Sequence, residues 1–268
     1  MRVIVAYRAI PGTGAGYATG DSMVRAFRRL GHAVYPYAKV YQSRQWIGRA
    51  LPPSPDLLVR MECGDGEEQY PELGALDCPK VYWTFDIDRY PQREAAIIDQ
   101  LGADLVCCAN PNHVKTDWHY LPYAADPDLF YPGKTPGHGA AIIGTPFEQR
   151  ADFARRAGVD LVSGVYHAAY ARRLRGLAVH VHHYASGGGG LLVMRPWETM
   201  ASGVLLITEA DKTHELHRDI PWLTYRDADH CRQLIAADHG DMVVRQNAAV
   251  MDGNTYIDRA RAILDIVG

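Results

Sequence analysis

The sequence predicts an α/β protein built from two doubly wound domains, each with a parallel sheet between layers of helices. Short apolar segments alternate with amphipathic ones, which is the order of strands and helices in such a sheet. A proline-marked passage at 121–139 interrupts this alternation, which then starts again. We therefore expect domains at residues 1–132 and 133–268, with the last helix a candidate to cross back onto the first domain.

The elements follow in order from the apolar spacing. A strand from Val3 to Tyr7 leads through a glycine-rich turn, 12–16, into an amphipathic helix that ends at Gly31. Further segments of the first half predict strands at 33–35, 57–60, 81–85 and 105–108 and a helix at 93–101. The second half predicts strands at 140–144, 160–162, 177–182 and 204–208 and helices at 147–157, 166–174 and 256–266.

Composition is that of an ordinary globular protein with a core: 47% of the 268 residues are apolar and 22% are charged. The net charge of −3 gives no bulk attraction to nucleic acid or to an anionic membrane, although a local basic patch stays open. The five cysteines form no C-x-x-C pair, and Cys107 and Cys108, inside an apolar run, are most simply core thiols. With no apolar run of membrane-spanning length, we expect a cytoplasmic protein.

The most informative segment runs from Arg195 to Gly203, directly before the apolar strand 204–208. Pro196 suits the first position of a helix, and Gly203 can close that helix in the left-handed conformation. Glu198 then falls in the first turn, close to free backbone N–H groups. Arg195 and the helix end could bind a diphosphate while Glu198 accepts hydrogen bonds from ribose hydroxyls. The alternative is a surface glutamate that only favours the helix dipole.

Several segments, in this order, resemble a known family. They are Leu30–Val34, Leu121–Pro132, Gly164–Tyr170, Arg195–Gly203 and Asn254–Arg259. On these residues the chain resembles glycosyltransferases of the GT-B architecture, closest to the compact group that includes spore-maturation CgeB-like proteins.

The resemblance implies that the second half binds a nucleotide diphosphate sugar, with UDP as the expected nucleotide, and that the first half presents the acceptor hydroxyl. It assigns the ribose contact to Glu198. Many retaining relatives carry a second glutamate eight positions earlier, where this chain has Gly190. Sugar recognition and stereochemistry therefore stay open. Candidate acceptors are a glycan, a small molecule or a modified DNA base, since small phage glycosyltransferases of this kind modify DNA.

Two carboxylates, Asp86 and Asp88, follow the strand 81–85 and would face the same way in an extended chain. We interpret them as the catalytic pair, with Asp86 as the general base toward the acceptor hydroxyl or as an acceptor anchor. A metal-binding Asp-x-Asp is the second interpretation, but it belongs to a single-sheet fold that leaves the repeated second half unexplained. A solvated turn is the third. We expect no essential divalent metal and no cofactor besides the nucleotide sugar.

Further donor contacts are expected at the ends of the first strand of each half. Gly14 and Gly16 would let backbone approach a ligand, and Arg150, after the strand that ends at Gly144, could bind phosphate in a bidentate manner. The alternative for Arg150 is an exposed residue at a helix start. Three neighbouring histidines could be metal ligands: His180, His182 and His183. We favour the interpretation that they are buried or line the cleft.

Charged clusters elsewhere are most simply solvated. These are the acidic residues Glu62, Asp65, Glu67 and Glu68 and the arginines at 25, 28, 29, 172, 173 and 175. The arginines could instead form a track for a polyanionic acceptor. The functional alternatives to a transferase are a non-catalytic sugar-nucleotide-binding protein and a nucleotide-sugar epimerase or hydrolase on the same frame.

Overall fold

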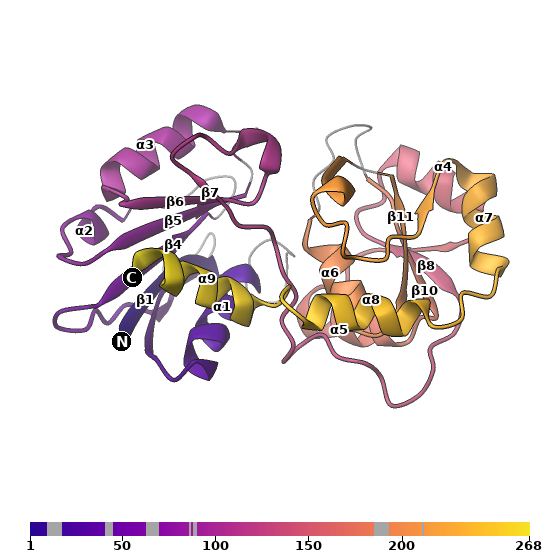
Figure 1. Ribbon diagram of the computed structural model, residues 1–268, viewed down its shortest axis with the longest axis horizontal. Helices are drawn as coiled ribbons and strands as arrows, with labels where there is room; N and C mark the ends of the chain where they lie inside the picture. Colours follow the sequence, from indigo (N-terminus) through magenta and orange to yellow (C-terminus); the bar gives the residue numbers. More distant parts are fainter. Residues whose placement is uncertain are drawn as a thin grey trace. The chain divides into compact units, whose positions relative to one another are not determined.

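A computed structural model describes residues 1–9, 18–40, 45–62, 70–85, 87, 90–184, 193–210 and 212–268. The chain forms two compact units, drawn in Figure 1. Unit 1 comprises residues 1–122 and 256–268, and unit 2 comprises residues 123–255.

The sheet of unit 1 has the order β3-β2-β1-β4-β5-β6-β7 in the described part of the chain. Its strands are β1 (Arg2–Ala9), β2 (Ala33–Val40), β3 (Trp46–Gly48), β4 (Leu57–Met61), β5 (Lys80–Thr84), β6 (Leu105–Cys108) and β7 (His119–Tyr120). The described strands pair in parallel except β3, which is antiparallel to β2. The inner strands β1, β4 and β5 are almost wholly buried, as expected where helices cover both faces.

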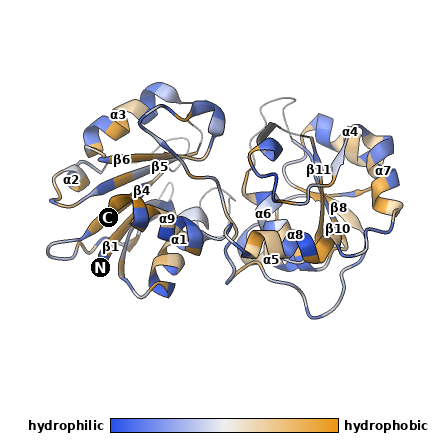
Figure 2. Cartoon of the chain, viewed as in Figure 1, coloured by the Kyte–Doolittle hydropathy of each residue, from blue (hydrophilic) through white to orange (hydrophobic). Residues whose placement is uncertain are grey.

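Helices cover both faces of this sheet (Figure 1): α1 (Ala18–Arg29) and α9 (Tyr256–Val267) on one, α2 (Pro71–Gly74) and α3 (Pro91–Leu101) on the other. Pro91 begins α3 with a preset φ, and Gly102 ends it with φ +61°. Figure 2 shows helices with mixed polar and apolar faces beside mostly apolar strands.

The sheet of unit 2 has the order β12-β11-β10-β8-β9, and all of its described pairs are parallel. Its strands are β8 (Ala140–Ile143), β9 (Asp160–Val162), β10 (Val179–His182), β11 (Leu205–Glu209) and β12 (Thr224–Tyr225). Its helices are α4 (Glu148–Ala157), α5 (His167–Arg175), α6 (Met194–Ala201), α7 (Ala228–Ala236) and α8 (Met242–Met251). Strand order reverses between β8 and β10, and doubly wound sheets bind ligands at the carboxyl ends of the strands at that point.

The two faces of β10 are covered by different helices. Val179 and Val181 pack with α4 and α7 in an apolar core. His180 and His182, which alternate with them, point to the opposite face, where His180 contacts α6. Polar side chains of β10 are thereby directed toward α6, next to the reversal of strand order.

The predicted alternation of strands and helices is confirmed in both halves. The sequence analysis missed β3, β7 and β12, each of two or three residues, as well as α2, α7 and α8. The unit boundary also differs from the expected one, because residues 123–132 pack in unit 2. Arg175 Nη1 donates to the Leu129 carbonyl at 2.9 Å, and Phe130 stacks edge-on against Tyr170. The last helix belongs to unit 1, where α9 packs on α1.

Candidate functional site

Arg150 lies at the reversal of strand order in unit 2. It is 5% exposed, and its Nη1 donates to the Thr145 carbonyl at 2.7 Å while Nη2 donates to the His183 carbonyl at 2.9 Å. These carbonyls follow β8 and β10, so the guanidinium joins the two strand ends. Burial and the nearby Arg195 lower its pKa, yet a guanidinium stays charged in proteins. The expected alternative, an exposed residue at a helix start, is wrong.

Gly144 leaves room for this guanidinium in its observed position. A Cβ at this position would lie 2.8 Å from Arg150 Nη1, closer than real Cβ contacts allow. Arg150 forms no ion pair with a carboxylate of the described residues; its guanidinium donates to two carbonyls and lies 5.7 Å from the centroid of the Phe147 ring. A buried cation of this kind favours an anionic ligand.

The helix α6 starts earlier than the sequence analysis expects. Its N-cap is Val193, so Pro196 is the third helical residue and Glu198 lies in the second turn, not the first. The expectation was wrong because proline lacks an N–H, and the first three helical positions all leave that group unbonded. The end of the helix is as expected: Gly203 has φ +65°, and its N–H donates to the Met200 carbonyl.

Glu198 is 5% exposed, and its Oε2 has no hydrogen-bond partner among the residues described. Burial raises the pKa of Glu198 to about 8; the Arg195 guanidinium lowers it, and Asp126 raises it further. The Arg195 side chain is partly exposed and makes no hydrogen bond or ion pair within the described ranges. The two expected donor contacts thus lie in one electrostatic environment, each with unused hydrogen-bonding capacity.

Tyr170 and Asp126 complete this environment, and the sequence analysis did not single them out. The Tyr170 hydroxyl on α5 is buried beside Glu198, and burial raises its pKa well above the usual value, so it remains an O–H donor. Asp126 is also buried. Both lie in segments that carry the family resemblance, which was the available signal.

His180 fixes the position of α6 on the sheet. Its Nε2 accepts from the Ile143 N–H at 3.4 Å, and its Nδ1 lies 2.6 Å from Thr199 Oγ1. The Thr199 hydroxyl donates to the Arg195 carbonyl, so Nδ1 must carry the hydrogen of the imidazole. Burial and the two arginines lower the pKa of His180 to about 3, which keeps this single neutral tautomer at physiological pH.

The other two histidines have separate surroundings. His183 stacks on Phe153 with ring centroids 4.2 Å apart, and its Nδ1 lies 2.7 Å from the Tyr225 hydroxyl. His182 is buried, and its Nε2 has no hydrogen-bond partner in the described part of the chain. Within those ranges no three metal-ligating side chains gather into one group.

Other residues named from the sequence lie outside the described residues: Gly14, Gly16, Asp65, Glu67, Glu68, Asp86, Asp88 and Gly190. Among the arginines expected to be solvated, Arg28, Arg29, Arg172 and Arg173 are exposed. Arg25 and Arg175 are only partly exposed: Arg25 Nη2 donates to Ser22 Oγ at 3.3 Å, and Arg175 donates to the Leu129 carbonyl.

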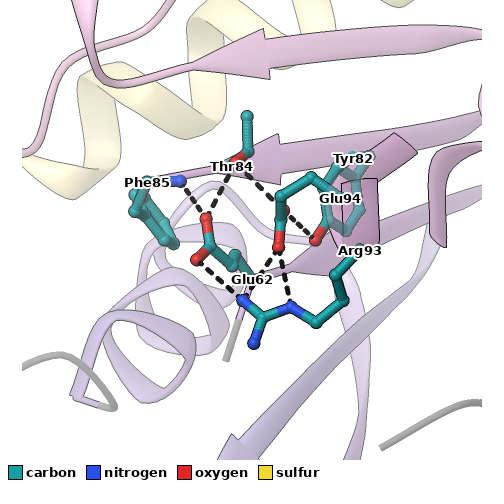
Figure 3. A network of polar contacts seen from close by, with 6 residues as sticks. All are labelled: Glu62, Tyr82, Thr84, Phe85, Arg93 and Glu94. Atoms are coloured by element: carbon teal, nitrogen blue, oxygen red, sulfur yellow. Dashed lines mark hydrogen bonds and ion pairs between the residues drawn. The ribbon is translucent and has the colours of Figure 1, made fainter. Parts of the chain in front are cut away.

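Glu62 is buried, which corrects the expectation of a solvated acid (Figure 3). Thr84 Oγ1 donates to Glu62 Oε2 at 2.8 Å, and the Phe85 N–H donates to the same oxygen. Glu94 accepts from Tyr82 at 2.6 Å and pairs with Arg93 at 3.0 Å. This network joins the carboxyl ends of β4 and β5 to the first turn of α3, next to the segment that carries Asp86.

A cavity of about 610 Å³ lies at the opposite edge of the unit 1 sheet, at the amino ends of β5 and β6. Cys78, Lys80, Asp104 and Ile266 contribute to its lining. Doubly wound sheets bind ligands at the other edge, so we do not assign this cavity to the site.

No family model matches the chain, and no curated protein matches it in sequence. Solved structures match it over nearly its full length. One is "T4 phage BGT in complex with UDP and Mn2+", with TM-score 0.61 and 12% identity over 99% of this chain and 98% of that one. Another is "alpha-glucosyltransferase (AGT) in complex with UDP", with TM-score 0.63 and 10% identity over 100% and 99%.

The fold is GT-B. A glycosyltransferase from Rickettsia africae ESF-5 matches in the same way, with TM-score 0.55 and 9% identity over 99% of this chain and 97% of that one. At these identities the likeness establishes the GT-B architecture of two doubly wound units. In the described ranges, no helix is long and apolar enough to cross a membrane.

Proposed function

We propose that this protein is a glycosyltransferase that moves a sugar from a nucleotide diphosphate donor, with UDP as the nucleotide, to an acceptor hydroxyl. The observation that carries the proposal is in unit 2. Arg150 and Arg195, which form no ion pair with a carboxylate among the described residues, act on each other, and Arg195 also acts on the buried Glu198, whose Oε2 has no hydrogen-bond partner in those ranges.

A nucleotide diphosphate matches these groups one by one. Its phosphates supply the negative charge that Arg150 and Arg195 lack, and the first turn of α6 offers N–H groups with no capping side chain. Glu198, once ionised, accepts from ribose hydroxyls. In this proposal the same cations stabilise the leaving diphosphate during transfer.

The acceptor side rests on sequence alone. Asp86 is the proposed base, with Asp88 beside it, and unit 1 is the proposed acceptor unit. The solved neighbours include an α-glucosyltransferase in complex with UDP and a 13-mer DNA, which supports a base carrying a hydroxyl as one candidate acceptor. A glycan and a small molecule are the other candidates.

Binding of the nucleotide is tested by titrating UDP into wild-type protein and into Arg195→Met in a calorimeter. Loss of one charge-assisted contact should weaken UDP binding about tenfold or more, since such bonds contribute about 1.5–3 kcal/mol. Arg173→Met, on the exposed face of α5, is the matched control and should bind as wild type. Equal UDP affinity in all three proteins would overturn the assignment.

Turnover is tested with radiolabelled UDP-sugars, first without an acceptor and then with glycans or with duplex DNA that carries a hydroxylated base. Transfer of label to an acceptor supports the proposal. Hydrolysis or isomerisation without acceptor supports the epimerase or hydrolase alternative. Binding with no turnover under every condition supports a non-catalytic sugar-nucleotide-binding protein.

A further inference from the structure

His182 is a buried side chain whose ring packs edge-on against Tyr184, with ring centroids 4.8 Å apart, while one of its ring nitrogens lacks a hydrogen-bond partner among the described residues. It is the last residue of β10, it is 3% exposed, and its Nε2 has no hydrogen-bond partner among the described residues. Buried ring nitrogens are normally paired, because an unpaired one loses its bond to water without a replacement. The orphan Nε2 therefore indicates a missing partner.

The position of His182 places that partner at the candidate anion site. His180 and His182 lie on the same face of β10, with ring centroids 6.5 Å apart. The imidazole of His180 is hydrogen-bonded to the Thr199 hydroxyl, and that hydroxyl donates a hydrogen bond to the carbonyl of Arg195 in the first turn of α6. His182 is two residues closer to the carboxyl edge of the sheet, where Arg150 joins β8 to β10.

The groups that shift the pKa of His182 are positive or neutral, while a carboxylate of the adjoining strand β11, Glu209, lies 3.4 Å from Nδ1 of the next residue, His183. The groups that act on it are His180 and His183 of the same segment, Arg195 of α6 and Arg150 of α4. Burial and these groups lower its pKa well below the usual value, so the imidazole is neutral when no anion is present. A bound anion reverses the sign of this field and favours the imidazolium.

We propose that His182 is a further ligand of the diphosphate, taking a proton from solvent when the anion binds and donating a hydrogen bond from Nε2 to a phosphate oxygen. The inference rests on the proposed donor site and extends it by a third cationic group. Arg150 and Arg195 carry fixed charges, whereas His182 becomes charged only with the ligand present. Donor binding is thereby coupled to proton uptake.

The test is calorimetric titration of inorganic pyrophosphate at about neutral pH in buffers of different ionisation enthalpy, which reports the protons exchanged on binding. Pyrophosphate is used because it has no ribose and so leaves Glu198 out of the measurement. Wild type, His182→Gln and His182→Phe are compared, with the exposed His138→Gln as the matched control. His182→Gln keeps an N–H donor but cannot titrate.

We expect wild type and the His138→Gln control to take up more protons than His182→Gln, and His182→Phe to bind pyrophosphate about tenfold or more weakly. Equal proton exchange in wild type and His182→Gln overturns the inference, even if His182→Phe fails to fold. Should UDP bind to wild type while both His182 variants bind pyrophosphate unchanged, the donor site stands and only the inference falls. If wild type binds neither UDP nor pyrophosphate, both fall.

Discussion

The hydroxyl of Thr199 links the imidazole of His180 to the first turn of α6. Nδ1 of His180 lies 2.6 Å from Thr199 Oγ1, which donates in turn to the Arg195 carbonyl at 2.7 Å. The His180 and Thr199 side chains are fully buried, so the hydrogen bond between them is shielded from water. The strand β10 therefore sets the position of the helix turn that carries Arg195.

Thr199→Val should destabilise unit 2. The substitution keeps the shape of the side chain but leaves the His180 Nδ1–H buried without an acceptor, a loss of about 1–3 kcal/mol. Thermal unfolding followed by circular dichroism should show a lower melting temperature than wild type. Thr199→Ser keeps the hydroxyl and serves as the control. A Thr199→Val protein as stable as Thr199→Ser would contradict the hydrogen bonds assigned from His180 through Thr199 to the Arg195 carbonyl.

Glu198→Ala should weaken UDP binding by roughly tenfold or more, because two charge-assisted bonds to the ribose are removed. Removing the 2′-hydroxyl from UDP should weaken wild-type binding similarly and scarcely affect the mutant, since both changes delete the same contact. Calorimetric titration of UDP and 2′-deoxy-UDP into wild type and Glu198→Ala completes this double-mutant cycle. Purely additive losses would mean that Glu198 does not touch the ribose.

Glu198→Gln should stabilise the ligand-free protein at alkaline pH. The carboxyl has a pKa of about 8 in the fold against an ordinary value of 4.5, so the native state holds an extra proton between these values. Stability is therefore lost as pH rises from about 4.5 to about 8 and stays reduced above that range. The variant should melt several degrees above wild type near pH 9 and close to it near pH 5. Glu215→Gln, at an exposed position, should show no such pH dependence.

Asp86→Asn should leave UDP affinity nearly unchanged and reduce turnover by roughly a hundredfold or more, as expected for the loss of a general base. Single-turnover transfer of label from a UDP-sugar is the measurement, with Asp88→Asn as the neighbouring comparison. Unchanged turnover in Asp86→Asn would assign that residue to a solvated turn.

Treatment with EDTA should leave transfer activity largely intact, because guanidinium groups and a helix end can offset the charge of the leaving diphosphate. Activity is compared before chelation, after chelation and after readdition of Mn²⁺ or Mg²⁺. An absolute and reversible requirement for either ion would restore the Asp-x-Asp interpretation of Asp86 and Asp88.

The sequence was sufficient for the doubly wound plan because buried parallel strands are long apolar runs. Strands such as β1 and β11 and the glycine-ended helices α1 and α6 followed directly from that pattern. Short edge strands could not be predicted from this pattern, because a strand such as β12, which spans two residues, has no apolar periodicity. The start of α6 was misplaced because a proline is tolerated anywhere in the first turn.

The candidate site was predictable only in part. Arg195, Glu198 and Arg150 could be selected because their neighbours in sequence carry helix and strand signals. Tyr170, from α5, and Asp126, from the segment before β8, shift the pKa of Glu198, and such proximity across the fold has no local signature in the sequence. The burial of Glu62 could not be predicted from the sequence for the same reason, because its hydrogen-bond partners come from another strand, β5, and the residue after it.

The chain leaves unit 1 after residue 122 and returns to it at Tyr256, so unit 2 is an insertion within unit 1. The two ends of the insertion lie side by side, as the bridge between Ala125 and Thr255 shows. During synthesis unit 2 is therefore complete before unit 1, which must wait for α9 to emerge from the ribosome. A nonsense mutation after residue 255 would leave the unit with the proposed donor site whole and its partner without a helix.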